Sequence, residues 1–263
     1  MGNFIRLYFA VAVVLLSGLA IAAEDDSELT VVPGIDLAFK QSSLNLILKG
    51  VAQDNAIKPN YTTIIPSLLV AHGKLYGMLS YDTPLTEYHE TIREQKVGEF
   101  QYSDRSYLRQ ESTVTMGYRV LPVLGLFAGF IKGETYIRAN DVKYNGTTST
   151  PEPNDISFVM RGYFTGLSSS RSFEGKGTLA ISAAYTKLDG VFTRGDQKGN
   201  VETFYSQSAS GYSTSLSWTG QMNGSMFYQV GLRYSRYLYD FGVGILQIDE
   251  PVKGLSFGVR NYF

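Results

Sequence analysis

Much of the chain alternates between apolar and polar residues with a period of two. In residues 112–120, Val114, Met116 and Tyr118 fall on one face, whereas Arg119 falls on the other. Successive side chains of a β-strand point to opposite faces of the sheet. The pattern therefore indicates a strand with one face in an apolar medium and the other in a polar medium.

The alternation recurs along the chain, and turn-forming residues separate the alternating segments. Besides 112–120, strands are predicted at 35–50, 61–70, 74–81, 125–138, 157–165, 178–186, 211–218, 226–235 and 253–263. Short connections alternate with long polar segments, which lie at 82–107, 140–154, 189–208 and 240–252. One short connection contains Asn223-Gly224, a strong signal for a β-hairpin.

This arrangement predicts one architecture. Bacterial membrane barrels have an even number of antiparallel strands, with short turns at one end and longer loops at the other. The predicted fold is therefore all-β, a transmembrane antiparallel up-and-down β-barrel of about ten strands. Eight or twelve strands are alternatives, because residues 44–51 and 97–103 can be divided differently. A soluble sandwich or lipocalin-like barrel would show the same alternation with its apolar residues turned inward.

The last predicted strand extends the pattern to the final residue. It reads K-G-L-S-F-G-V-R-N-Y-F and places Phe257, Val259 and Phe263 on one face. This segment resembles the final strand of Gram-negative outer-membrane β-barrel proteins, which ends in a C-terminal phenylalanine read by the barrel-assembly machinery. The resembled signal has an apolar or aromatic residue two positions before the end, where this chain has Asn261. The resemblance implies an assembly signal formed by Phe263, Val259 and Phe257, and contact with outer-membrane lipid and lipopolysaccharide.

The first residues have the pattern of a secretory signal peptide. Arg6 precedes an apolar run at 7–19, and small residues follow at 20–22. A retained membrane anchor would need about 20 apolar residues, and this run is shorter. We expect cleavage after residues 1–22, which leaves a single barrel domain at 23–263. An even strand count then places both termini on the periplasmic side of the outer membrane.

The composition argues against several classes of function. There is no cysteine, so no disulfide framework holds the fold. The 23 Lys and Arg nearly balance the 24 Asp and Glu, which does not suggest nucleic acid as a partner. The chain has two histidines, His72 and His89, and no phosphate-binding or dinucleotide motif. We expect no metal site and no cofactor.

Three glycines, Gly125, Gly129 and Gly133, have the G-x-x-x-G spacing of helices that dimerise in membranes. The apolar run around them, residues 120–131, is too short to cross a membrane as a helix. On a strand, their even spacing puts all three on one face. There they would thin the wall or relieve crowding, and we favour this interpretation.

The polar faces of the predicted strands contain several charged residues and tyrosines. A charge on the lipid side near the membrane centre would cost about 2–4 kcal/mol, so these side chains are predicted to line the lumen. They are Arg119, Arg161, Arg233, Arg260, Glu111 and Tyr163. One interpretation is an arginine-lined path that favours anions. The other is a filled interior, in which the arginines pair with carboxylates and tyrosines.

The function that follows is a monomeric outer-membrane barrel, either a small porin-like channel or a structural surface protein, without catalysis. One alternative is an outer-membrane enzyme that hydrolyses lipid or peptide. It would need His89, Glu87 or Glu90 to meet a nucleophile. Another alternative is adhesion or binding through the long polar segments 82–107, 140–154 and 189–208.

Overall fold

The computed structural model describes residues 29–48, 55–96, 99–144, 147–148, 156–195, 201–242 and 246–263. Their structure is almost entirely extended. The strands are β1 (Leu29–Ser42), β2 (Leu44–Leu48), β3 (Asn55–Ile57), β4 (Asn60–His72), β5 (Leu75–Pro84), β6 (Tyr88–Lys96), β7 (Glu99–Leu121), β8 (Leu124–Tyr144), β9 (Thr147–Thr148), β10 (Ile156–Phe173), β11 (Gly177–Gly195), β12 (Val201–Tyr205), β13 (Ser208–Asn223), β14 (Met226–Asp240) and β15 (Leu246–Asn261). Among these residues, no helix is long and apolar enough to cross a membrane.

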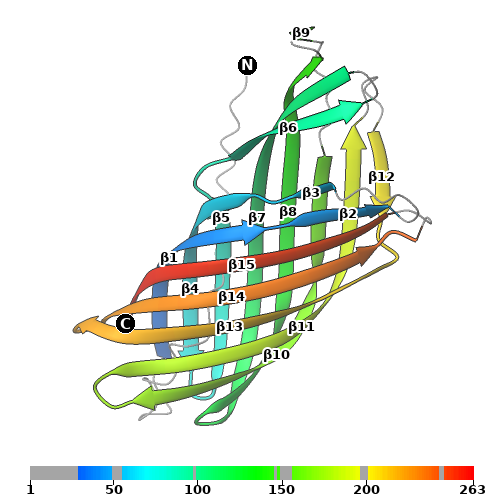
Figure 1. Ribbon diagram of the computed structural model, residues 1–263. Helices are drawn as coiled ribbons and strands as arrows, with labels where there is room; N and C mark the ends of the chain where they lie inside the picture. The colour runs from blue at the N-terminus through cyan, green and yellow to red at the C-terminus, as the bar shows by residue number, and fades with distance from the viewer. Residues whose placement is uncertain are drawn as a thin grey trace, which may run out of the picture.

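Ten of these strands form a closed antiparallel barrel. Each pairs with the next in the order β1, β4, β5, β7, β8, β10, β11, β13, β14 and β15 (Figure 1). The barrel closes because β15 also pairs with β1, from Gly34 opposite Arg260 to Ser42 opposite Val252. Closure gives every barrel strand two neighbours and leaves the wall without an open edge. The predicted up-and-down barrel of about ten strands is confirmed.

The two ends of the barrel differ. At the end that we call the turn end, adjacent strands are joined by tight turns, and Gly73, Gly175 and Gly224 adopt positive φ angles of 57°, 64° and 51°. The hairpin predicted at Asn223-Gly224 is among them. At the opposite end, which we call the loop end, β6 pairs with β7 and β12 pairs with β11 beyond the barrel wall (Figure 1).

The main differences from the sequence prediction lie at the loop end. The long polar segment 82–107 was predicted to be a loop, but β6 and β7 form an antiparallel ladder there, with Tyr88 opposite Tyr107. Its residues are polar on both faces, so no apolar alternation marks these strands. The first strand begins at Leu29 and breaks at Ser43. The predicted signal peptide, residues 1–22, lies outside the described residues.

The outer surface of the wall has an apolar belt. Met116 is 69% exposed, Ile181 57% and Leu232 53%, all on the face predicted to meet lipid. Side chains of the opposite parity fill the lumen, and most of the apolar ones belong to two clusters. The loop-end cluster contains Phe158, Met160, Tyr239 and Phe241, among others. The turn-end cluster consists of Val32, Leu69, Ala71, Tyr76, Met78 and Phe127.

Candidate functional site

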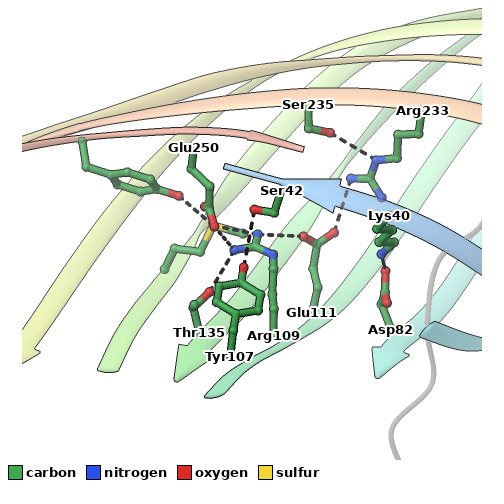
Figure 2. A network of polar contacts seen from close by, with 12 residues as sticks. Lys40, Ser42, Asp82, Tyr107, Arg109, Glu111, Thr135, Arg233, Ser235 and Glu250 are labelled. Carbon is green, nitrogen blue, oxygen red and sulfur yellow. Dashed lines mark hydrogen bonds and ion pairs between the residues drawn. The ribbon is translucent and has the colours of Figure 1, made fainter. Parts of the chain in front are cut away.

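A layer of charged side chains crosses the lumen between the two clusters (Figure 2). Five strands contribute to this charged layer, and its members are Lys40 (β1), Asp82 (β5), Arg109 and Glu111 (β7), Arg233 (β14) and Glu250 (β15). Three are cations and three are anions. The layer is therefore neutral overall, although each strand brings its charge from a distant part of the sequence.

Arg109 is the centre of the charged layer. Its Nη1 forms an ion pair with Glu250 and donates a hydrogen bond to Thr135 Oγ1 at 3.1 Å. Its Nη2 lies 3.3 Å from Glu111 Oε2. The side chain of Arg109 is 4% exposed and that of Glu250 is 0% exposed. A charge buried this deeply is tolerated only when it is paired and hydrogen-bonded, so these contacts hold β7, β8 and β15 together across the lumen.

The other charges of the layer are paired as well. Glu111 Oε1 lies 3.3 Å from Arg233 Nη2, and Arg233 Nε donates to Ser235 Oγ at 3.3 Å. Lys40 forms an ion pair with Asp82. Glu111 therefore bridges two arginines, one buried and one partly exposed. The layer contains a carboxylate for every cation that the described residues place in it.

The loop-end cluster lies directly against the charged layer. The Tyr239 hydroxyl donates to Met160 Sδ at 2.8 Å, and Arg109 Nη2 lies 3.9 Å from the same sulfur. The Phe158 ring packs edge-on against the Tyr239 ring, with 4.6 Å between their centroids. Tyr239, Phe158 and Met160 are each 1% exposed or less. Aromatic packing and paired charges together fill the lumen at this height.

A further buried ion pair lies outside the charged layer, toward the turn end and at the β1–β15 ladder that closes the barrel. Arg260 Nη2 lies 2.7 Å from Asp36 Oδ2, and both side chains are buried. The strands leave room for this pair by placing glycines beside it. A Cβ at Gly34 would lie 2.5 Å from Arg260 Nη1, and a Cβ at Gly258 would collide with Asp36 Oδ1. This pair spans the β1–β15 seam.

The structure places four of the six predicted lumen residues on the inner face. Arg233 and Glu111 belong to the charged layer, Arg260 to the seam, and Arg119 shares the parity of the buried Thr113 and Thr115.

The inner-face assignment of Arg161 and Tyr163 is wrong. Arg161 is exposed beside Lys132 and Asp189 on the neighbouring strands, and Tyr163 is 73% exposed against the Phe130 ring. In β10 the inner face is formed by Phe158 and Met160 of the loop-end cluster. An aromatic inner face and a charged outer face are typical of a wall in water, so the apolar side of this strand segment points inward.

Four residues of the charged layer were not predicted: Lys40, Asp82, Arg109 and Glu250. Asp82 and Glu250 lie in segments that were predicted to be loops, where no strand parity was assigned. Arg109 has the same parity as Glu111, two residues further along β7. Extending the alternation of residues 112–120 backwards would have placed it on the inner face.

The residues of the predicted assembly signal and His89 lie outside the charged layer. Phe257, Val259 and Phe263 are exposed on the outer face, and the backbone of Phe263 pairs with that of Val31 at 3.0 and 3.2 Å. Their role in assembly stays a prediction. His89 is exposed on β6, where its ladder partner is Ser106. Over the described ranges, no group of three or more histidines, cysteines or carboxylates could hold a metal ion.

Comparisons with known proteins agree on the architecture. No protein-family model matches the chain, and no curated protein matches it by sequence. Among solved structures, the outer membrane protease OmpT from Escherichia coli superposes with a TM-score of 0.66 at 13% identity, covering 89% of this chain and 97% of that one. The translocator domain of the autotransporter NalP from Neisseria meningitidis has a TM-score of 0.43 at 11% identity, covering 91% and 90%. The chain thus has the closed barrel fold of outer-membrane β-barrel proteins.

Proposed function

We propose that this protein is a closed outer-membrane barrel that acts as a structural surface protein and not as an open channel. The observation that supports this most directly is the filled lumen. The charged layer and the loop-end cluster lie one on the other, and their central side chains are almost completely buried. Barrels of this size lie between small filled barrels and the wide porins, and the packing here is of the filled type.

The pairing of charges argues against an anion path. Arg109 and Arg233 both contact Glu111, and Arg109 also pairs with Glu250. An anion drawn to these arginines would have to displace carboxylates that are already in contact with them. The neutral layer therefore offers no net attraction for ions of either sign.

The proposal includes a location and an orientation. The apolar belt would lie in the outer membrane, with the turn end in the periplasm and the loop end outside the cell. The charged outer surface around Arg161, Lys132 and Asp189 would then stand above the hydrocarbon region, where charge costs little. The ladders β6–β7 and β11–β12 would be presented to the outside as rigid surfaces by a monomeric barrel.

Planar-bilayer recordings test this function. Purified wild-type protein should show no steady conductance. The double variant Arg109→Ala and Glu250→Ala removes a buried pair from the layer and should give frequent openings. Arg161→Ala, on the outer face, is the matched control and should stay silent. Steady ohmic channels in the wild-type protein would overturn the proposal.

An enzyme that hydrolyses peptide or lipid is the second candidate, and one observation favours it. His89 and Ser106 face one another across the β6–β7 ladder, and opposed side chains on a ladder lie about 4.5–5.5 Å apart at their Cβ atoms. Ser106 is 4% exposed, which hides its hydroxyl from a substrate and makes this the weaker candidate. Hydrolysis of peptide or acyl-ester substrates that His89→Ala and Ser106→Ala both abolish would establish it.

A further inference from the structure

The lumen contains a cavity between the charged layer and the turn-end cluster. Its volume is about 110 Å³, and every barrel strand contributes at least one lining residue. Lys40, Asp82 and Arg233 of the charged layer form one side. The rest is lined by apolar side chains, among them Ile65, Phe127 and Phe164, and by several serines and threonines. The space is thus bounded by paired charges at one end and elsewhere by a mostly apolar surface that also carries hydroxyl groups.

One polar group of this cavity has no partner. Thr115 lines the cavity and is 2% exposed, and its Oγ1 makes no hydrogen bond to any described residue. Buried hydroxyls in proteins are almost always hydrogen-bonded, because an unmade hydrogen bond cannot be replaced by bulk water. Since a hydroxyl both donates and accepts, a group placed in the cavity could satisfy Thr115 with a hydroxyl or with a carbonyl oxygen.

The charges at the cavity define what else the occupant must be. Lys40 is paired with Asp82, and Arg233 with Glu111. A charged guest would therefore find no free counter-ion, and it would lose its hydration on entering an apolar chamber. A neutral guest pays neither penalty. By size, one water needs about 10–15 Å³ of such space, so the cavity admits roughly eight water-sized groups.

We propose that this cavity is a binding site for a small neutral amphiphile, a compact apolar body with one hydroxyl or carbonyl group, of about the size of phenol. The apolar body packs against Ile65 and the Phe127 and Phe164 rings, and the polar group hydrogen-bonds to Thr115. The proposal is independent of the proposed function, because a barrel that is closed to ions can hold such a guest within its wall.

The test uses para-fluorophenol, observed by fluorine NMR, with protein refolded into detergent in its presence. Refolding around the probe removes any dependence on an entry path. We expect a saturable bound signal that is distinct from the probe in micelles, and no such signal for para-fluorobenzoate, the charged counterpart. Crystals grown with para-bromophenol should show the bromine inside the cavity, next to the Phe127 and Phe164 rings. Equal binding of the benzoate, or a cavity that holds only water, would overturn the proposal.

Three variants separate the cavity from non-specific binding. Ala184→Leu fills part of the cavity and should abolish the bound signal. Thr115→Val keeps the shape, removes the unpartnered hydroxyl and should weaken para-fluorophenol binding about tenfold, the loss of one good hydrogen bond. Thr219→Val, at a buried threonine that does not line the cavity, should leave binding unchanged. Binding that survives both cavity variants would refute the site, whereas a failure of the conductance test would leave it standing.

Discussion

At the scale of single residues, Glu250 is the charged group that depends most on its partner. Its side chain is 0% exposed, and Arg109 is the cation that contacts it. Burying a pair of charges gains little overall, because the attraction mainly offsets the lost hydration. Removing one partner is different, since the remaining charge stays buried without compensation. The intact pair therefore adds little net stability, whereas the loss of either partner is costly.

This difference gives a prediction for Arg109→Met. The substitution leaves Glu250 buried and alone, and it should lower the free energy of unfolding by about 3–5 kcal/mol. Adding Glu250→Leu to the same chain should recover a large part of that loss, because no unpaired charge remains in the layer between them. Urea unfolding in detergent, followed by tryptophan fluorescence, measures the free energy of unfolding of the single and the double variant. A double variant less stable than Arg109→Met alone would show that the pair itself is strongly stabilising.

At the scale of elements, the inner faces depend on glycine as much as on charge. Gly125, Gly129 and Gly133 of β8, which were predicted to share one face, all lie at inward-facing positions. A Cβ on Gly129 would lie 2.1 Å from the backbone oxygen of Val114 and 2.5 Å from the Phe164 ring. Glycine here lets β7 and β8 approach closely while an aromatic ring from β10 covers them.

Gly129→Ala should accordingly destabilise the barrel by about 1–3 kcal/mol, the usual cost of overpacking a tight interior. Gly77→Ala is the matched control, because nothing lies within 4 Å of a Cβ at that strand position. Thermal unfolding of the two variants in the same detergent compares them directly. If both alanines cost equally, the close packing around Gly129 would not be the cause of the effect.

The elements also show how far the sequence could lead. Alternation located the barrel strands and oriented β7, β13 and β14 correctly, because their outward residues, such as Met116 and Leu232, are apolar and exposed on the outer surface. It failed in β10, where Phe158 points inward and Arg161 outward. Alternation with a period of two shows that the two faces of a strand differ, but it does not show which face points outward. The answer depends on the medium around the barrel, and that medium changes along a strand that extends beyond the membrane.

The contacts within the charged layer could not be predicted from the sequence either. Its members come from strands that are far apart in sequence, so their pairing is decided by barrel closure and register, which no local pattern contains. Glu111 and Arg233 were expected in the lumen, yet nothing in the sequence indicated that they lie 3.3 Å apart. Glu250 lies in the segment 240–252, which was predicted to be a loop, so no strand parity was assigned to it.

At the scale of the whole molecule, the fold depends on the seam between its first and last barrel strands. The ladder between β1 and β15 closes the barrel, and it runs from Gly34 to Ser42 on β1. The buried Arg260–Asp36 pair lies across this ladder, with Gly34 and Gly258 making room for it. The outer face of the neighbouring β14–β15 ladder has a comparable pair, Arg236 and Asp249, with contacts of 2.9 and 3.0 Å.

These two pairs allow a controlled test of the seam. Arg260→Met leaves Asp36 buried without its cation, and it should cost about 3–5 kcal/mol. Arg236→Met breaks an equally well-formed pair whose arginine is 40% exposed, and it should cost at most about 1 kcal/mol. Folded barrels migrate faster than unfolded chains on gels of unheated samples. When samples are heated stepwise before the gel, the temperature at which the fast band disappears measures the thermal stability of each variant. We expect a clearly lower temperature for Arg260→Met alone. Equal shifts for the two variants would mean that the seam is held by its backbone ladder, with no special contribution from the buried pair.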